Sequence, residues 1–217
     1  MNLEQARFNM IEQQIRPWDV IDANVLKLLS VVKREDFVPL AHKALAFVDM
    51  EIPLGFGQCM LAPRVEARLL QDAAIKKNET VLEIGAGSGF MAALLAHQAQ
   101  RVISLEIIPE LAQMARANLQ AAGIHNAEVR QLDGAKGAPA ESPFDVILLS
   151  GSVAEVPQAL LAHLRVGGRL VAIVGDEPVM RATIVTRASE TGFTTSQPWD
   201  TVVARLVNFP EASGFQF

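Results

Sequence analysis

The 217-residue sequence has one cysteine and no long uninterrupted apolar run. A single thiol, Cys59, cannot form a disulfide within the chain, which suits a reducing compartment. No segment approaches the roughly 18 apolar residues that a spanning helix needs. The N-terminus also lacks a basic region followed by an apolar one, as an export signal would require. The sequence therefore predicts a cytoplasmic protein with no membrane segment.

The sequence also lacks an excess of positive charge. It has 19 Lys and Arg against 24 Asp and Glu, a net charge of -5, and a sequence pI near 5.4. No basic stripe offsets this balance, which argues against a nucleic-acid or anionic-membrane partner. The four histidines are scattered without ligand spacing, so we expect no metal site.

What the sequence does contain is an alternation of apolar strand and helix patterns from residue 80 onward. Strands are predicted at 81–84, 101–106, 127–132, 144–150 and 169–174, with helices at 90–99, 109–122 and 156–164. Continuous apolar strands that alternate with helices indicate an α/β fold with a mostly parallel sheet and helices on both faces. We expect one domain, 1–217, with an N-terminal helical extension (1–79), a cofactor-binding core (80–175) and C-terminal edge strands (176–217).

The two ends of the chain have patterns of their own. Helical spacing predicts helices at 6–15, 22–32 and 62–75, and antiparallel edge strands are predicted at 181–189 and 201–209, with Gly192 and Pro198 between them.

The stretch VLEIGAGSGF, residues 81–90, places three glycines between an apolar strand and an apolar helix. Such a turn lets the main chain approach a ligand closely and exposes amide donors at a helix start. A dinucleotide fingerprint would need glycine where this chain has Phe90, and no Lys-Ser or Lys-Thr pair closes a phosphate loop. The frame from Glu83 to Gly89 resembles the first motif of Rossmann-like methyltransferases, which bind S-adenosyl-L-methionine (SAM).

Acidic residues follow the neighbouring strands. Glu106 ends the next strand at the spacing where a carboxylate meets a ribose diol. Asp133 and Gly134 follow the third strand, where they could contact adenine or simply form a turn. Glu83 interrupts an apolar strand, so we expect it to accept from the turn's own amides and to meet the methionine amino group. The predicted cofactor-binding residues are Glu83, Gly85, Ala86, Gly87, Ser88, Gly89, Glu106, Ile107, Asp133 and Gly134.

Several stretches together resemble the protein-L-isoaspartate O-methyltransferases: REDFVP, IPLGFGQ, VLEIGAGSGF, LDGAKGAP, PFDVILLSG and GGRLVAIVG, over roughly residues 7–175. The resemblance implies a Rossmann-like fold and methyl transfer from SAM, leaving S-adenosyl-L-homocysteine. The implied acceptor is the carboxylate of isoaspartyl or D-aspartyl residues in damaged proteins.

The resemblance departs from the family at the substrate loop. Leu61 stands where the family has an active-site serine, and its side chain has no hydrogen-bonding group. Gln58 matches the family and is the candidate for positioning, and the other predicted substrate residues are Cys59, Ser150 and Gly151. Cys59 is read either as a weak donor replacing the hydroxyl or as a small buried residue.

Three functional readings stay open at this point. The chain is an isoaspartyl-type O-methyltransferase, a SAM-dependent methyltransferase of the same lineage with another acceptor, or a SAM-binding protein that has lost transfer activity. The sequence leaves the oligomeric state undetermined.

Overall fold

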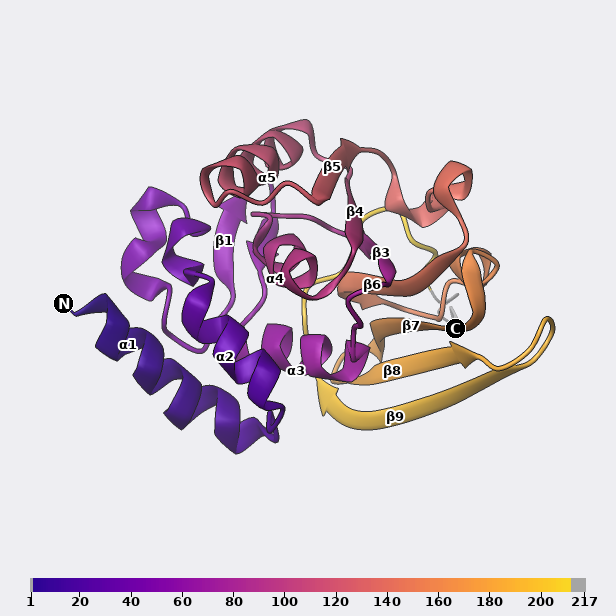
Figure 1. The fold of residues 1–217 in the computed structure, drawn as a ribbon, viewed down its shortest axis with the longest axis horizontal. Helices are drawn as coiled ribbons and strands as arrows, with labels where there is room; N and C mark the ends of the chain where they lie inside the picture. Colours follow the sequence, from indigo (N-terminus) through magenta and orange to yellow (C-terminus); the bar gives the residue numbers. More distant parts are fainter. Residues whose placement is uncertain (1, 212–217) are drawn as a thin grey trace, which may run out of the picture.

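The computed structural model describes residues 2–211, which build a seven-stranded sheet covered by helices (Figure 1). The strand order is β5-β4-β3-β6-β7-β8-β9, with parallel pairing from β5 to β7 and antiparallel pairing for β8 and β9. This confirms the predicted mostly parallel sheet with antiparallel strands at one edge. The strands of this sheet are β3 (Thr80–Ile84), β4 (Arg101–Glu106), β5 (Ala127–Gln131), β6 (Phe144–Val153), β7 (Leu164–Asp176), β8 (Val179–Arg187) and β9 (Phe193–Thr201).

The helices fall into an N-terminal group and a group between the strands. They are α1 (Leu3–Met10), α2 (Ala23–Val31), α3 (Pro63–Ala73), α4 (Phe90–Gln98), α5 (Pro109–Ala121) and α6 (Gln158–Leu161). Shorter π or 3-10 turns occur at 11–15, 16–18, 34–36, 40–45, 134–136 and 139–141. Within residues 2–211, no helix is long and apolar enough to cross a membrane.

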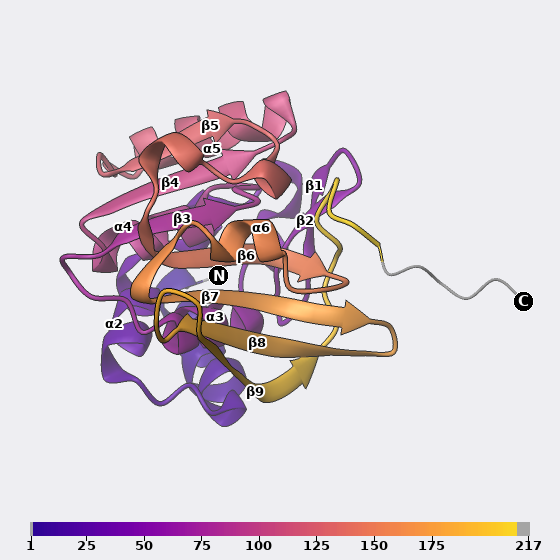
Figure 2. The same ribbon diagram turned by 90° about the vertical axis from the view of Figure 1, so that its right-hand side faces the viewer.

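The core lies on both faces of the sheet. On one face, alternate side chains such as Val81 and Val102 pack with the N-terminal helices, α4 and α5. On the other face, Leu82 and Ile103 pack with α6 and with Phe209 near the end of the described chain. Because the central strands are buried on both faces, they are continuous apolar runs, which is why the sequence revealed them. Figure 2 shows the strands in order, with α6 in front of β6.

Two predicted elements were misplaced. The helix expected at 156–164 is only the four-residue α6, because β7 already begins at Leu164. The last strand was expected at 201–209, but β9 ends at Thr201 and contains Pro198. Register in β9 shifts between the Ala182–Trp199 and Ile184–Ser196 pairs, so proline is tolerated at this irregular edge.

The N-terminal part contains a hairpin that was not predicted. Strand β1 (Ile52–Gly55) pairs with β2 (Gln58–Met60) through Phe56 and Gly57, which both have positive φ. Two-residue turns of this kind match the twist of the paired strands. The hairpin lies beside the carboxyl ends of the sheet strands, near the C-terminal segment (Figure 2).

Candidate active site

The candidate site forms where neighbouring strands end. The glycine turn 85–89 follows β3, Glu106 ends β4, Asp133 lies just after β5, and Ser150 lies in β6. These strands are adjacent in the sheet, and β3 is flanked by β4 and β6 on opposite sides. Such a point, where successive crossovers diverge, leaves a crevice at the carboxyl edge of a parallel sheet. The sheet therefore brings the predicted cofactor residues to one edge.

The glycine turn has the backbone that its sequence predicts. Gly89 caps α4 with φ of 86°, and a Cβ there would lie 3.1 Å from the carbonyl oxygen of Ala115. Only glycine combines this left-handed conformation with so close an approach to α5. The flanking Ala86 and Ser88 are buried. The N-terminus of α4 thereby begins at the site, and the first amides of a helix have no partner within the helix.

Glu106 ties the end of β4 to this turn. Its side chain accepts from the backbone N–H of Gly87 at 2.9 Å and from that of Ile108 at 3.0 Å. The residue is 6% exposed, and Ile107 beside it is half-buried. Each carboxylate oxygen accepts more than one hydrogen bond, so both retain capacity for a ligand's hydroxyl groups.

If Glu106 binds the ribose as predicted, replacing it with alanine is expected to weaken SAM binding by about 1 to 3 kcal/mol, because the ribose hydroxyls and the amide of Gly87 would lose their acceptor. Isothermal titration calorimetry measures this change. Glu110→Ala, at an exposed position in the first turn of α5, is the matched control. An unchanged dissociation constant for Glu106→Ala would remove this residue from the site.

Glu83 is fully buried, and its partners differ from those expected. Its carboxylate accepts from the hydroxyls of Ser104 at 2.5 Å and Ser150 at 2.9 Å. The turn's amides at Gly85 and Ala86 instead donate to the carbonyl of Leu105. The expected contact with the turn's amides is therefore wrong, because β4 supplies a carbonyl for them. Burial raises the pKa of Glu83 to about 7, against the two hydroxyl hydrogen bonds.

Ser104 was not among the predicted site residues. It is fully buried in β4 and lies directly opposite Glu83 in the β3–β4 ladder. A polar side chain in the middle of the apolar run RVISLEI was the available signal. Ser150 was predicted as a substrate residue, and the structure places its hydroxyl on Glu83.

Asp133 and Gly134 form a tight turn. Asp133 accepts from the backbone N–H of Ala135 at 3.1 Å and caps a short 3-10 helix. A Cβ at position 134 would lie 2.2 Å from Cγ2 of Ile84, so only glycine fits against β3. The turn-forming role is thus observed, and the contact with adenine stays a prediction.

The substrate side of the site is closed by the hairpin. A cavity of about 20 Å³, roughly the space of one water, lies between the residue after β2 and the glycine turn. Leu61 is 4% exposed there, and Gln58 is half-buried. The lining residues are Cys59, Met60, Leu61, Glu66, Gly85, Ala86, Gly87, Ser88, Phe90, Met91 and Ser150, and Gln58 is not one of them.

Cys59 donates its thiol hydrogen to Glu51 over 3.3 Å. Burial and the neighbouring Glu51 carboxylate raise the pKa of the thiol to about 12. Because the thiolate is the reactive form, this thiol is unreactive near neutral pH. The structure favours the reading of Cys59 as a small, partly buried residue.

A buried ion pair supports the loop that carries Leu61. Arg34 is 1% exposed and is paired with Glu66. Its guanidinium also donates to the carbonyls of Leu61 at 2.7 Å and Ala46 at 3.1 Å. Sequence reasoning did not identify these two charged residues, although Arg34 opens the REDFVP stretch. The pair fixes the main chain at the position of the family's serine.

The C-terminal segment completes the site from the other side. The backbone of Ser152 donates to Ala204 at 2.8 Å, and Leu206 donates back to Ser152 at 2.9 Å. A Cβ added at Gly85 or Gly151 would lie 2.9 or 2.8 Å from Cδ2 of Leu206. Leu206 therefore packs on both glycines, a contact that sequence reasoning missed.

A glycine turn between β3 and α4, an acidic residue ending β4 and a β5–β4–β3–β6 arrangement define the fold class of the Rossmann-like SAM-dependent methyltransferases. Comparison with known proteins makes the assignment more specific. Residues 5–204 match the family model described as Protein-L-isoaspartate(D-aspartate) O-methyltransferase. The chain belongs to this family, whose members are SAM-dependent enzymes acting on isoaspartyl proteins.

Individual relatives agree with the family model. The chain is 41% identical over 171 residues to a protein-L-isoaspartate O-methyltransferase of Methanoculleus marisnigri, covering 79% of this chain and 78% of the relative. It is 40% identical over 190 residues to protein-L-isoaspartate O-methyltransferase 1 of Syntrophobacter fumaroxidans, covering 88% and 89%.

Solved structures share the fold at lower identity. A chain from Plasmodium falciparum, assigned as a protein-L-isoaspartate O-methyltransferase and solved in complex with S-adenosyl-L-homocysteine, has a TM-score of 0.79 at 18% identity. The match covers 94% of this chain and 97% of that one. At this identity the likeness concerns the fold.

Proposed function

We propose that this chain transfers the methyl group of SAM to the carboxylate of isoaspartyl or D-aspartyl residues, with the site described above. The observation that supports the placement is the gathering of Glu83, the glycine turn and Glu106 at one sheet edge. When bound, SAM supplies an activated methyl group on a sulfonium. The protein then has to bind and orient the cofactor and the acceptor, and to exclude water from the site.

The residues fit a cofactor with an adenosine and an amino-acid tail. Glu106 has acceptor capacity for the ribose diol, and its spacing from the turn places it beside the α4 N-terminus. The Glu83 carboxylate is fully buried, and within residues 2–211 its hydrogen-bond donors are the hydroxyls of Ser104 and Ser150, of which Ser150 lines the cavity. A cationic group placed beside it would stabilise its ionised form.

The acceptor requires no general base from the protein. An isoaspartyl carboxylate is ionised near neutral pH, so alignment and desolvation are the remaining requirements. Leu61 and Leu206 lie on two sides of the site as apolar groups, and the unreactive Cys59 thiol takes no proton. Several polar groups near the glycine turn already have protein partners: the Ser150 hydroxyl donates to Glu83, and the amides of Gly85 and Ala86 donate to the carbonyl of Leu105.

Transfer of labelled methyl from SAM to a short isoaspartyl peptide tests this function. The controls are a peptide of the same sequence with an ordinary aspartyl residue and a reaction without peptide. Base-labile label on the isoaspartyl peptide alone is the expected result. Bound SAM without any transfer would favour the other two readings, a different acceptor or lost transfer activity, and the apolar Leu61 would be the first residue to implicate.

Replacing Leu61 with serine is expected to raise kcat/KM for the isoaspartyl peptide by about tenfold, because the hydroxyl restores one hydrogen bond to the acceptor. Initial rates at saturating SAM measure this change. Leu61→Ala controls for the space gained by removing the larger side chain. An equal rise in both variants would show that space, rather than the hydroxyl, limits the wild-type rate.

A further inference from the structure

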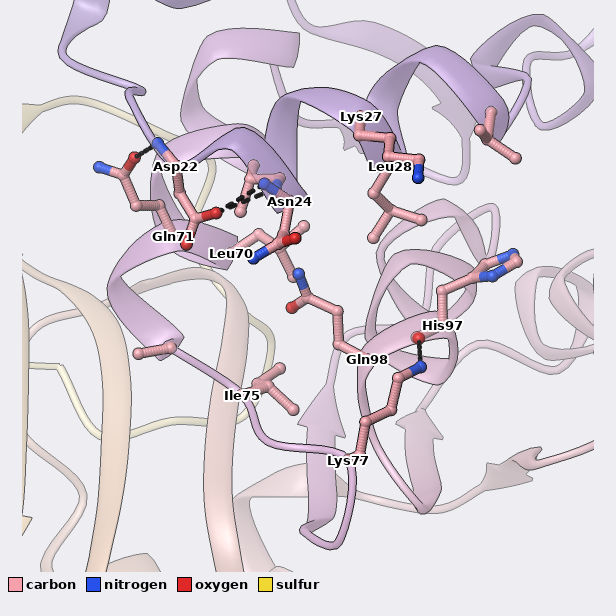
Figure 3. Close-up of a pocket in the computed structure, with 13 residues that line it drawn as sticks. Asp22, Asn24, Lys27, Leu28, Leu70, Gln71, Ile75, Lys77, His97 and Gln98 are labelled. Atoms are coloured by element: carbon pink, nitrogen blue, oxygen red, sulfur yellow. Dashed lines mark hydrogen bonds between the residues drawn. The ribbon is translucent and has the colours of Figure 1, made fainter.

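A second cavity lies at the other end of α4 from the candidate active site, between α2, α3 and the C-terminal end of α4 (Figure 3). Its volume of about 650 Å³ is within the range of ligand pockets, roughly 300 to 1,000 Å³. We call it the α2–α4 pocket. Its lining residues are Asp22, Asn24, Val25, Lys27, Leu28, Val31, Leu70, Gln71, Ala74, Ile75, Lys77, His97 and Gln98.

The pocket combines an apolar floor with a basic rim. Leu28, Leu70 and Ile75 contribute apolar side chains, and Val31 at its edge is 58% exposed. The two lysines on the rim, Lys27 and Lys77, form no ion pair with any carboxylate in the part of the chain that the structure describes. With Asp22 as the acidic residue of the lining, the two lysines leave the pocket a small excess of positive charge, in a chain of net charge -5.

Most polar groups of the pocket are already engaged. The carboxylate of Asp22 caps α2 by accepting from Asn24 N at 2.7 Å. Gln71 accepts from the amides of Ile21 and Asp22 and donates to the carbonyl of Asp19. These groups therefore hold the pocket in shape. Asp22 keeps its negative charge, and in the view of Figure 3 it lies on the other side of the pocket from Lys27.

Three side chains, Lys77, Lys27 and Gln98, define what remains for a ligand. Lys77 donates to the carbonyl of His97 at the end of α4 and so offsets that helix's negative end (Figure 3). The ammonium of Lys27 has no carboxylate partner among residues 2–211. Gln98 reaches from α4 toward Asn24, and its buried Oε1 has no hydrogen-bond partner among the described residues (Figure 3). A buried acceptor without a donor is costly, so an N–H from a ligand would stabilise it.

We propose that the α2–α4 pocket binds an extended apolar and acidic segment of the protein substrate, away from the residue that is methylated. An apolar side chain would cover Leu28 and Ile75, a carboxylate would pair with Lys27, and a main-chain N–H would donate to Gln98. A fatty acid offers the apolar and anionic parts but no N–H donor, which is why a polypeptide fits better. The proposal rests on the proposed function, since it names a second contact with the same substrate.

The position of the pocket sets which substrates reach it. Helix α4 joins the two sites, because its first residue follows the glycine turn and Gln98 is its last. Nine helical residues span about 13 Å, which an extended chain covers in about four residues, and a path that follows the surface needs more. A short isoaspartyl peptide therefore occupies the active site alone, whereas a long unfolded chain occupies both.

A binding measurement tests the pocket directly. The probe is a capped, fluorescent peptide of sequence Leu-Ile-Asp-Leu-Asp with ordinary aspartates, followed by anisotropy. Lys27→Glu is expected to weaken its binding about tenfold, because attraction becomes repulsion, and Gln98→Leu is also expected to weaken it. Lys43→Glu, an exposed lysine outside the pocket lining, is the matched control and is expected to have no effect.

A kinetic measurement tests the link to catalysis. Two long isoaspartyl peptides are compared, one with the Leu-Ile-Asp-Leu-Asp segment about fifteen residues from the isoaspartate and one with a Gly-Ser segment there. Wild-type KM is expected to be about tenfold lower for the first, with equal kcat. Lys27→Glu is expected to abolish this difference and to leave KM for a short isoaspartyl peptide unchanged.

The outcomes separate the two proposals. Equal KM values for both long peptides, with the short peptide methylated normally, would overturn the second contact and leave the proposed function intact. No methylation of any isoaspartyl peptide would overturn the function, and anisotropy would still decide the pocket. Probe binding that is absent, or equal in Lys27→Glu and wild type, overturns the pocket proposal, as does binding of decanoate without binding of the peptide.

Discussion

Replacing Arg34 with methionine is expected to lower the free energy of unfolding by about 3 to 5 kcal/mol. The guanidinium is almost fully buried and has three partners: the Glu66 carboxylate and the carbonyls of Leu61 and Ala46. Methionine has a comparable length but donates no hydrogen bond. All of these acceptors would then be buried without their donor.

Chemical denaturation with urea at pH 7 measures the loss. Arg101→Met, which breaks an exposed ion pair with Glu128, is the matched control and is expected to cost less than about 1 kcal/mol. Burial raises the pKa of Glu66 to about 7 despite Arg34, so adding Glu66→Gln to Arg34→Met is expected to recover part of the loss. A loss for Arg34→Met as small as that of the control would show that the pair does not hold the loop.

The same substitution has a functional consequence. Because Arg34 fixes the carbonyl of Leu61, its loss frees the main chain at the wall of the small cavity. We expect a larger fall in kcat than in SAM affinity, since the glycine turn and Glu106 do not contact Arg34. The structure therefore links the REDFVP stretch to the acceptor side of the site rather than to the cofactor side.

The central fold could be predicted because its physical signal is local. Strands β3, β4 and β6 are buried on both faces, so their sequences are short apolar runs. Helix α5 is marked by Pro109 in its first turn and Gly123 after its end. The predicted antiparallel strand β8 was also confirmed, because apolar and polar residues alternate along its sequence. The glycine turn could be identified because it contains glycine at positions where other residues do not fit.

The last strand could not be predicted because its exposed edge carries no apolar pattern. Strand β9 is mostly exposed, polar and interrupted by Pro198, and it forms because β8 offers unpaired main-chain groups. The more apolar stretch 202–209 looked like a strand, but it buries Val203 and Phe209 instead. Among the described residues, its main chain forms one isolated bridge, between Arg205 and Ser152 of β6.

The site could be predicted in position but not in its hydrogen bonds. Glu83 was identified as a charge that needs a partner, yet the partner depends on strand register, which aligned Ser104 with it. Arg34 and Glu66 are 32 residues apart and meet only through the packing of the N-terminal part on α4. Contacts of this kind carry no local signature, because they arise from the tertiary structure.

Replacing Glu83 with glutamine is expected to change how stability depends on pH. In the wild type, burial raises the pKa of Glu83 from 4.5 to about 7. Between pH 4.5 and 7, the folded state therefore keeps a proton on this carboxyl that the unfolded state has released. Stability from this group therefore falls as pH rises from about 5 to 8, by about 3 kcal/mol. Glutamine does not titrate, and its variant should lose this part of the decline. Urea denaturation at several pH values measures it.

The same group predicts the pH dependence of cofactor binding. A cation bound beside Glu83 favours the ionised carboxylate, so SAM affinity is expected to rise about tenfold between pH 6 and 8 in the wild type. Glu83→Gln is expected to bind more weakly and without this rise. Glu106→Gln serves as the control that weakens binding but retains the slope. A pH-independent dissociation constant in the wild type would show that Glu83 keeps its protonation state when SAM binds, and the carboxylate would then serve Ser104 and Ser150 alone.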